Sequence, residues 1–187
     1  LYTKDTSPGG TGQYGNGNPN FNITGPCDTV WAGNAFQKNV SASSAAGNEN
    51  TITITAAGSV SGGQGILVWS QNYVVNNSGT ISGATANKLA DAVKGNPGLS
   101  GTSNVAVLFK GAADVAGAKN QLINSGVISS PGIAVEADDG DTVIHNTGTI
   151  SGGNYAIYAY IPAKTVKIYV TGGEVDGKIY GGIGAGD

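Results

Sequence analysis

A seven-residue motif recurs along this chain at a nearly regular interval, and it constrains the possible folds more than any other feature. Three close copies follow the pattern Asn-Ser/Thr-Gly-x-Ile-Ser, and weaker copies flank them. The close copies span residues 77–83, 124–130 and 146–152, and the weaker ones span 56–62, 171–177 and 23–25. Self-similarity of this kind is typical of repeat architectures, in which each unit buries its apolar side only by stacking on its neighbours.

Aligning the copies produces one column that is apolar and β-branched throughout. This column contains Ile23, Val60, Ile81, Ile128, Ile150 and Val175. β-Branched residues favour strands, and an invariably apolar column favours the protein interior. The next position is Ser, Thr or Asp in every copy. Because successive strand residues point to opposite faces, the alignment predicts a stripe of stacked core residues beside a polar outer column.

The spacing of the copies predicts the architecture. Successive members of the apolar column are 37, 21, 47, 22 and 25 residues apart, which indicates a period of about 22 residues with two enlarged repeats. That length holds roughly three short strands and their corners at ~3.3 Å per residue. We therefore predict an all-β fold, a single-stranded parallel β-helix (β-solenoid) of about six rungs. Stacked turns would place Asn77, Asn124 and Asn146 above one another, either as a side-chain ladder or simply as turn residues.

The chain divides into an arm and one solenoid domain. Residues 1–20 are rich in Gly, Asn and Pro and are predicted to form an extended N-terminal arm, which either folds back on its own solenoid or adds to a neighbouring molecule. Residues 21–187 form the predicted solenoid domain, with insertions at about 36–50 and 84–103. Within the second insertion, Leu89, Ala92 and Val93 have helical spacing and Gly95 follows as a cap, which predicts a short helix.

Composition excludes several classes of partner. The chain has a net charge of −3, and its nine basic residues are all lysine, so specific nucleic-acid binding through arginine forks is not expected. No apolar run approaches the ~20 residues of a transmembrane helix. Cys27 is the single cysteine, which rules out a disulfide within the chain. We interpret it as a small apolar residue near a corner, with a reactive or intermolecular thiol as the alternative.

The sequence offers little support for catalysis or cofactor binding. Asp138, Asp139 and Asp141 cluster in a Gly-containing segment that is typical of a solvated turn, although the same oxygens could bind Ca²⁺. The single histidine, His145, has no Cys, His or acidic partner at metal-ligand spacing, so it is expected at a corner or on the surface. No carboxylate pair has the controlled separation that acid/base catalysis needs. We therefore expect a protein without enzymatic activity, cofactor or metal.

The heptads at 77, 124 and 146 give the chain a family resemblance. It resembles the β-helical passenger regions of bacterial autotransporters and filamentous surface adhesins, over about residues 51–184. This resemblance implies an exported, arginine-poor shaft that displays loops or adheres to surfaces. The implied location is extracellular, at the cell surface. The related β-helical lyases use an arginine base, which this chain lacks.

Three functions follow from these observations. The first is a secreted structural subunit of an extracellular filament, a homo-polymer in which solenoids stack end to end and the arm pairs with a neighbour, because raw solenoid ends must be paired or capped. Its expected assembly residues are Leu1, Tyr2, Ile179, Tyr180 and Ile183. The alternative is an adhesin or carbohydrate-binding module that binds surface glycans through the 84–103 insertion or through Tyr155, Tyr158 and Tyr160. A polysaccharide-degrading enzyme is the third and least supported.

Overall fold

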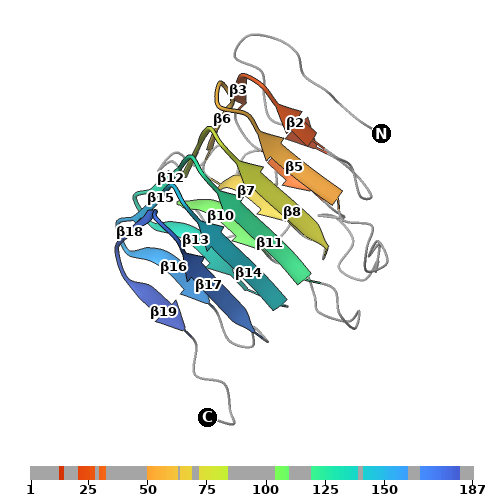
Figure 1. Ribbon diagram of the computed structural model, residues 1–187. Helices are drawn as coiled ribbons and strands as arrows, with labels where there is room; N and C mark the ends of the chain where they lie inside the picture. Colours follow the sequence, from red (N-terminus) through yellow and green to blue (C-terminus); the bar gives the residue numbers. More distant parts are fainter. Residues whose placement is uncertain are drawn as a thin grey trace, which may run out of the picture.

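The described part of the chain is all β and winds into a parallel β-solenoid (Figure 1). This computed structural model describes residues 13–14, 21–27, 30–32, 50–62, 64–68, 72–83, 104–109, 119–138, 141–159 and 165–181. No helix occurs within these ranges. The 84–103 insertion, where a short helix is predicted, lies outside them, as does all of the 36–50 insertion except Asn50.

The strands form three parallel sheets, which we name A, B and C. Sheet A contains β1 (Gln13–Tyr14), β4 (Val30–Ala32), β7 (Gln64–Val68), β10 (Val105–Phe109), β13 (Ile133–Ala137), β16 (Tyr155–Ala159) and β19 (Ile179–Gly181). Sheet B contains β2 (Phe21–Ile23), β5 (Asn50–Ile54), β8 (Tyr73–Asn77), β11 (Lys119–Asn124), β14 (Asp141–Asn146) and β17 (Val166–Val170). Sheet C contains β3 (Pro26–Cys27), β6 (Ser59–Gly62), β9 (Thr80–Gly83), β12 (Val127–Ser130), β15 (Thr149–Gly152) and β18 (Glu174–Asp176).

The chain visits the three sheets in strict rotation, so every strand pairs with the strand three places further along. All of these pairs are parallel, which is the arrangement that a one-way coil requires. The turns that begin with β5, β8, β11 and β14 have neighbouring strands on both sides in all three sheets. The structure thus supports a solenoid of about four enclosed turns, and the count of six rungs stays a prediction.

The core runs along the axis of the coil and is filled by inward-pointing residues from all three sheets, most of them aliphatic. In sheet C, the strand register places Val60, Ile81, Ile128, Ile150 and Val175 in one column. The first four are fully buried, whereas Val175 is only partly buried. This stripe is the column that the sequence motif marks, because a β-branched side chain at one fixed point of each turn packs on its counterpart in the next.

Ile23 does not belong to that column, which corrects the sequence alignment. Ile23 lies in sheet B, where it pairs with Ile54. The residue that pairs with Val60 in sheet C is Cys27. The three-residue match Ile23-Thr24-Gly25 is too short to fix a register, and the turn after Ile23 delays the inward position by four residues. Cys27 therefore packs against the core as a small apolar side chain, in line with its expected role.

Asn77, Asn124 and Asn146 form a buried ladder at the corner between sheets B and C. Asn77 Nδ2 donates to Asn124 Oδ1 at 2.8 Å, and Asn124 Nδ2 donates to Asn146 Oδ1 at 2.7 Å. Asn146 Nδ2 ends the series by donating to the Gly148 and Glu174 carbonyls at 3.0 and 2.9 Å. The three side chains are at most 1% exposed. The motif asparagines are therefore a continuous hydrogen-bonded column inside the coil.

The motif glycines form a second column, where successive turns approach most closely. A Cβ atom on Gly126 would collide with the Gly79 carbonyl oxygen, and one on Gly148 would collide with the Gly126 carbonyl oxygen. The backbone bonds that cross this column explain the closeness, since Val127 N donates to Gly79 O at 2.9 Å and Thr149 N to Gly126 O at 2.9 Å. Glycine is thus required here for packing between turns.

The strands β7 and β10 of sheet A are buried on both faces. Leu67 and Leu108 are in register with each other and alternate with inward residues, so their side chains point away from the core. Both are nevertheless fully buried. Strands buried on both faces read as continuous apolar runs, which is how the sequences of β7 and β10 read.

The structure places part of the N-terminal arm on the chain's own solenoid. β1 pairs in parallel with β4 and extends sheet A by one strand beyond sheets B and C. For residues 13 and 14, the pairing is therefore within one molecule. The remainder of the 1–20 arm lies outside the described residues.

Candidate interaction surface at the C-terminal edge

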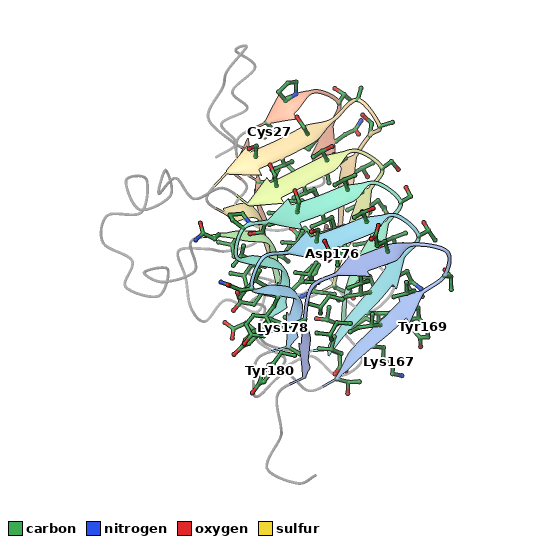
Figure 2. All side chains as sticks on the ribbon, turned by 90° about the vertical axis from the view of Figure 1, so that its left-hand side faces the viewer. Cys27, Lys167, Tyr169, Asp176, Lys178 and Tyr180 are labelled. Carbon is green, nitrogen blue, oxygen red and sulfur yellow. The ribbon has the colours of Figure 1, made fainter. Side chains whose placement is uncertain are left out.

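The last strand of each sheet forms an open end of the solenoid. We name the strands β17, β18 and β19 together the C-terminal edge. Each of them has a paired neighbour on one side only, among the strands that the structure describes. Figure 2 shows Lys178 and Tyr180 at this end and Cys27 at the opposite end. The unpaired sides present backbone N–H and C=O groups that can accept another strand.

The C-terminal edge also exposes inward-pointing apolar side chains. Val170 pairs with Asn146 and Ile179 pairs with Ile157, so both continue interior columns. Nevertheless, Val170 is 45% exposed and Ile179 is 54% exposed, whereas Asn146 and Ile157 one turn earlier are fully buried. Val166, Ile168 and Val175 on the same edge are partly buried. The end of the core is therefore open to solvent here.

Two tyrosines on the outer faces of this edge each stack on an aromatic ring of the preceding turn. Tyr169 stacks on His145 with ring centroids 4.8 Å apart and an interplanar angle of 10°. Tyr180 stacks on Tyr158 with centroids 4.9 Å apart and an angle of 13°. Tyr169 is 46% exposed and Tyr180 is 39% exposed. Each ring covers a neighbour in the preceding turn, and its exposed surface can pack against a further turn.

The charges on the C-terminal edge are balanced. Lys167, Glu174 and Asp176 are exposed on these strands, and Lys178 is exposed directly before β19. Ser151 Oγ contacts Asp176 Oδ2 at 3.3 Å, so at least one of these groups has a partner in the preceding turn. Two positive and two negative groups leave this edge without net repulsion toward a second copy of itself, and they favour a solvated periphery around an apolar centre.

The opposite end of the solenoid differs in its exposure. Phe21 and Ile23 on β2 point into the core and are only 7% and 3% exposed, and Val30 on β4 is fully buried. Phe21 and Ile23 occupy the first described positions of their columns, as Val170 and Ile179 occupy the last, whereas Val30 is preceded in its column by Gln13 of β1. The two ends therefore differ: apolar core residues are covered at the β2 end and open at the β17 end.

The expected assembly residues separate into two groups. Ile179 and Tyr180 lie on the C-terminal edge, and both are exposed. Leu1, Tyr2 and Ile183 lie outside the described residues. The sequence reasoning missed Ile168, Val170 and Tyr169, although the apolar alternation of 165–170 was the signal that could have found them.

A second cluster of aromatic residues lies on the outer face of sheet A. Tyr155 lies 5.0 Å from Tyr158 and 6.0 Å from Tyr180 between ring centroids, in tilted and edge-on arrangements. The sequence grouped Tyr155 and Tyr158 with Tyr160, which lies outside the described residues together with the 84–103 insertion. The structure instead brings in Tyr180 from the next turn, a proximity that only the strand register reveals.

The acidic cluster and the histidine do not form a metal site within the described residues. No group of three His, Cys, Asp or Glu side chains suitable for a metal occurs there. Asp138 follows β13 and Asp141 begins β14, while Asp139 lies outside the described ranges. His145 is exposed on sheet B and stacks on Tyr169. Across the described residues, no helix is long and apolar enough to span a membrane.

Comparison with known proteins assigns no family to the chain. The chain matched no family model, no curated protein and no solved structure. The class that the strands define is a parallel β-solenoid. A parallel β-solenoid is the architecture that the resemblance to autotransporter passengers and surface adhesins implies, and membership of that family stays a prediction.

Proposed function

We propose that this chain is a secreted structural subunit of an extracellular filament, in which β-solenoids stack end to end. The observation that supports the proposal most is the C-terminal edge, where, among the described strands, β17, β18 and β19 have a neighbour on one side only and the inward residues Val170 and Ile179 are about half exposed. A second copy placed on this edge would pair the open backbone groups and remove apolar surface from water, at roughly 25 cal/mol per Å².

The composition is compatible with an extracellular role. Only 11% of the residues are charged, and 32 of the 187 are glycine. The polar outer column of sheet C is built from hydroxyl side chains and one carboxylate: Ser61, Ser82, Ser129, Ser151 and Asp176. The proposal assigns the chain no catalytic role. Its extracellular location is the one expected from the sequence and from the family resemblance.

Placing a charge in the centre of the edge tests this function. In the variant Val170→Lys, the ammonium would have to be buried without a partner in the stacked state, which costs roughly 3 kcal/mol or more. We expect assembly to need about a hundredfold higher protein concentration than in the unmodified chain, measured by sedimentation velocity and electron microscopy. A wild-type chain that stays monomeric at every accessible concentration would contradict the proposed function.

Thr80→Lys provides the matched control. Thr80 is an exposed, outward-pointing residue on an inner turn, in register between Ser59 and Val127. The substitution adds the same charge far from both ends of the solenoid, so assembly should be unchanged. If Val170→Lys and Thr80→Lys assemble equally well, the C-terminal edge is not the contact.

The tyrosine cluster favours a second candidate, a carbohydrate-binding module. Tyr155, Tyr158 and Tyr180 lie within 6.0 Å of one another and present ring surfaces on the outside of sheet A. Aromatic faces with a hydroxyl at the rim suit contact with sugar rings. A glycan array probed with the wild type and with Tyr155→Ala separates the two functions. Loss of a specific signal in the variant supports binding, and a blank array for the wild type removes this candidate.

A further inference from the structure

The three sheets do not contain equal numbers of strands, and the additional strand would obstruct end-to-end stacking of two copies. Among the described strands, sheet A has seven members, whereas sheets B and C have six each. The additional member of sheet A is β1, which precedes the first strands of sheets B and C. Two identical copies therefore cannot be joined end to end as one uninterrupted coil unless one terminal strand of sheet A leaves its place.

The order of the strands identifies which positions coincide. The chain leaves the last turn on β19 in sheet A, so the next strand of an uninterrupted coil belongs to sheet B. In a second copy, β2 would then lie on β17, β3 on β18 and β4 on β19. In the stacked state, β19 of the first copy would therefore pair with β4 of the second copy. In the single molecule, β1 already occupies that position beside β4.

β1 and β19 match in register as well as in position. In β1, Gln13 lies beside the inward residue Val30, and Tyr14 lies beside Trp31. In β19, Ile179 lies beside the inward residue Ile157, and Tyr180 lies beside Tyr158. In both strands a tyrosine thus follows the residue that is in register with the inward column, and in both the next residue in the sequence is glycine.

Within the described residues, β1 is the shorter of the two strands. It contains two residues, whereas β19 contains three and adds the stacking of Tyr180 on Tyr158. We propose that β1 is a built-in cap, which occupies on β4 the site that β19 of a second copy takes in the assembled filament. This inference rests on the proposed end-to-end stacking. It also changes the role expected for this part of the arm: β1 does not pair with a neighbouring molecule but is released from β4 when a second copy binds.

The residues that would meet at the junction are complementary. Continuing the interior columns brings Ile168 onto Phe21, Val170 onto Ile23 and Val175 onto Cys27 of the second copy. Every one of these contacts joins two apolar side chains. Phe21 and Ile23 are only 7% and 3% exposed in the single molecule, so these contacts require their present cover to be displaced on stacking, and the newly buried apolar surface comes from the C-terminal edge.

One interior hydrogen bond is missing at the junction. In the inner turns, the residue after the motif glycine donates its N–H to the glycine carbonyl of the preceding turn, as Val127 does to Gly79. The corresponding residue at the β3 end is Pro26, which has no N–H. The junction is therefore weaker than an interior turn. A weaker junction is consistent with a β3 end that pairs only with a matching second copy.

The same double substitution in the two competing strands tests the cap in the full-length chain. Gln13→Pro with Tyr14→Pro removes both N–H groups of β1 and disfavours its pairing. Because apparent affinity scales with the uncapped fraction, half-assembly should occur at a concentration on the order of tenfold lower than in the wild type. Ile179→Pro with Tyr180→Pro, in β19, should abolish assembly.

The two proline variants distinguish the inference from the function on which it rests. If the wild type assembles and the β1 variant assembles less readily, the arm contributes to the contact and the cap is wrong. If the wild type and both variants remain monomeric, the proposed filament function itself fails. Circular dichroism of each variant verifies that the strands are retained.

A disulfide cross-link tests the predicted register directly. The variant Val175→Cys adds a second thiol, and in the stacked state it lies beside Cys27 of the next copy, at about 4.8 Å, within the range that a disulfide spans. Within one molecule, the two positions lie at opposite ends of sheet C, five strand spacings and roughly 24 Å apart. Oxidised glutathione accepts the two electrons and supplies the exchange, so each linked pair of thiols leaves reduced glutathione.

We expect a ladder of covalent oligomers on a non-reducing gel for Val175→Cys. Asp176→Cys, on the opposite face of the same strand, should give no ladder. Cross-linking of Val175→Cys in a Cys27→Ser background would indicate contact between two C-terminal edges and would overturn the register. Filaments without a ladder in Val175→Cys would contradict the register too, while leaving the proposed function standing.

Discussion

At the scale of single residues, the motif divides its work among three side chains. The asparagine is buried and hydrogen-bonded to its counterparts, the glycine permits close approach of turns, and the isoleucine fills the core column. The column of asparagines is bounded by Ile54 before Asn77 and by Val170 after Asn146. A polar ladder in the middle of an apolar column fixes the register of the turns, because a slip would leave buried amide groups unpaired.

The middle asparagine should be the most sensitive member of the ladder. Asn124→Ala removes the acceptor of Asn77 Nδ2 and the donor to Asn146 Oδ1, both in buried positions. We expect a loss of about 2–4 kcal/mol in the free energy of unfolding, measured by denaturant titration, because buried polar groups left unpaired cost about 1–3 kcal/mol each.

Asn76→Ala is the matched control for this prediction. Asn76 lies in β8 beside Asn77, points to the opposite face and is partly exposed. Its replacement should change the free energy of unfolding by less than about 0.5 kcal/mol, as is usual for surface positions. Equal losses in the two variants would mean that the ladder contributes no more than a surface amide.

At the scale of strands, the sequence predicted the solenoid well wherever the motif is complete. The expected three short strands per turn correspond to one strand in each sheet, as in the turn formed by β5, β6 and β7. Alternation and β-branched composition are sufficient for this, because every turn repeats the same demand.

The errors have physical causes of their own. The assignment of Ile23 to the sheet C column was wrong because three residues cannot fix a register, and Cys27 in that column is not β-branched. The proximity of Tyr155 to Tyr180 was out of reach because it depends on how two distant strands pair. The unequal exposure of the two ends depends on what covers each core column, which a periodic pattern does not encode.

The C-terminal edge should differ from inner strands in amide exchange. In the single molecule, every second amide of an edge strand faces solvent, so amides of β17, β18 and β19 should exchange faster than those of β14, β15 and β16. Stacking would pair these amides with a second copy. We expect exchange at 166–181 to slow at least about tenfold on assembly, measured by mass spectrometry. Unchanged exchange there in assembled protein would place the contact elsewhere.

At the scale of the whole molecule, the two ends are complementary rather than equivalent. The three sheets keep one strand direction from β2 to β17, so an added copy in the same orientation continues each sheet as parallel pairs. A contact between two C-terminal edges would instead create antiparallel pairs at the junction. Complementary ends generate an open, growing assembly, whereas a contact between like ends stops at a dimer.

The glycine column offers a substitution that acts on the assembly without disturbing the single molecule. Gly25 lies at the β3 end of this column, and an added Cβ there would meet nothing within 4 Å. At a junction, the same Cβ would face the carbonyl of Gly173 of the other copy. An inner glycine shows the equivalent contact, since a Cβ on Gly126 would meet the carbonyl of Gly79 in the preceding turn. Gly25→Ala should therefore leave the melting temperature within about 2 °C of the wild type and prevent filament growth, in thermal denaturation and electron microscopy.

Gly126→Ala gives the opposite pattern and serves as the control. Its Cβ would collide with the Gly79 carbonyl inside one molecule, so the single solenoid itself should lose stability, by about 2 kcal/mol or more. Filaments of normal length from Gly25→Ala would show that no second copy packs against the β3 end as an inner turn does. Because Gly25 is open in the single molecule, that outcome could not be attributed to failure of the fold, and growth would then have to use a surface other than the continued coil.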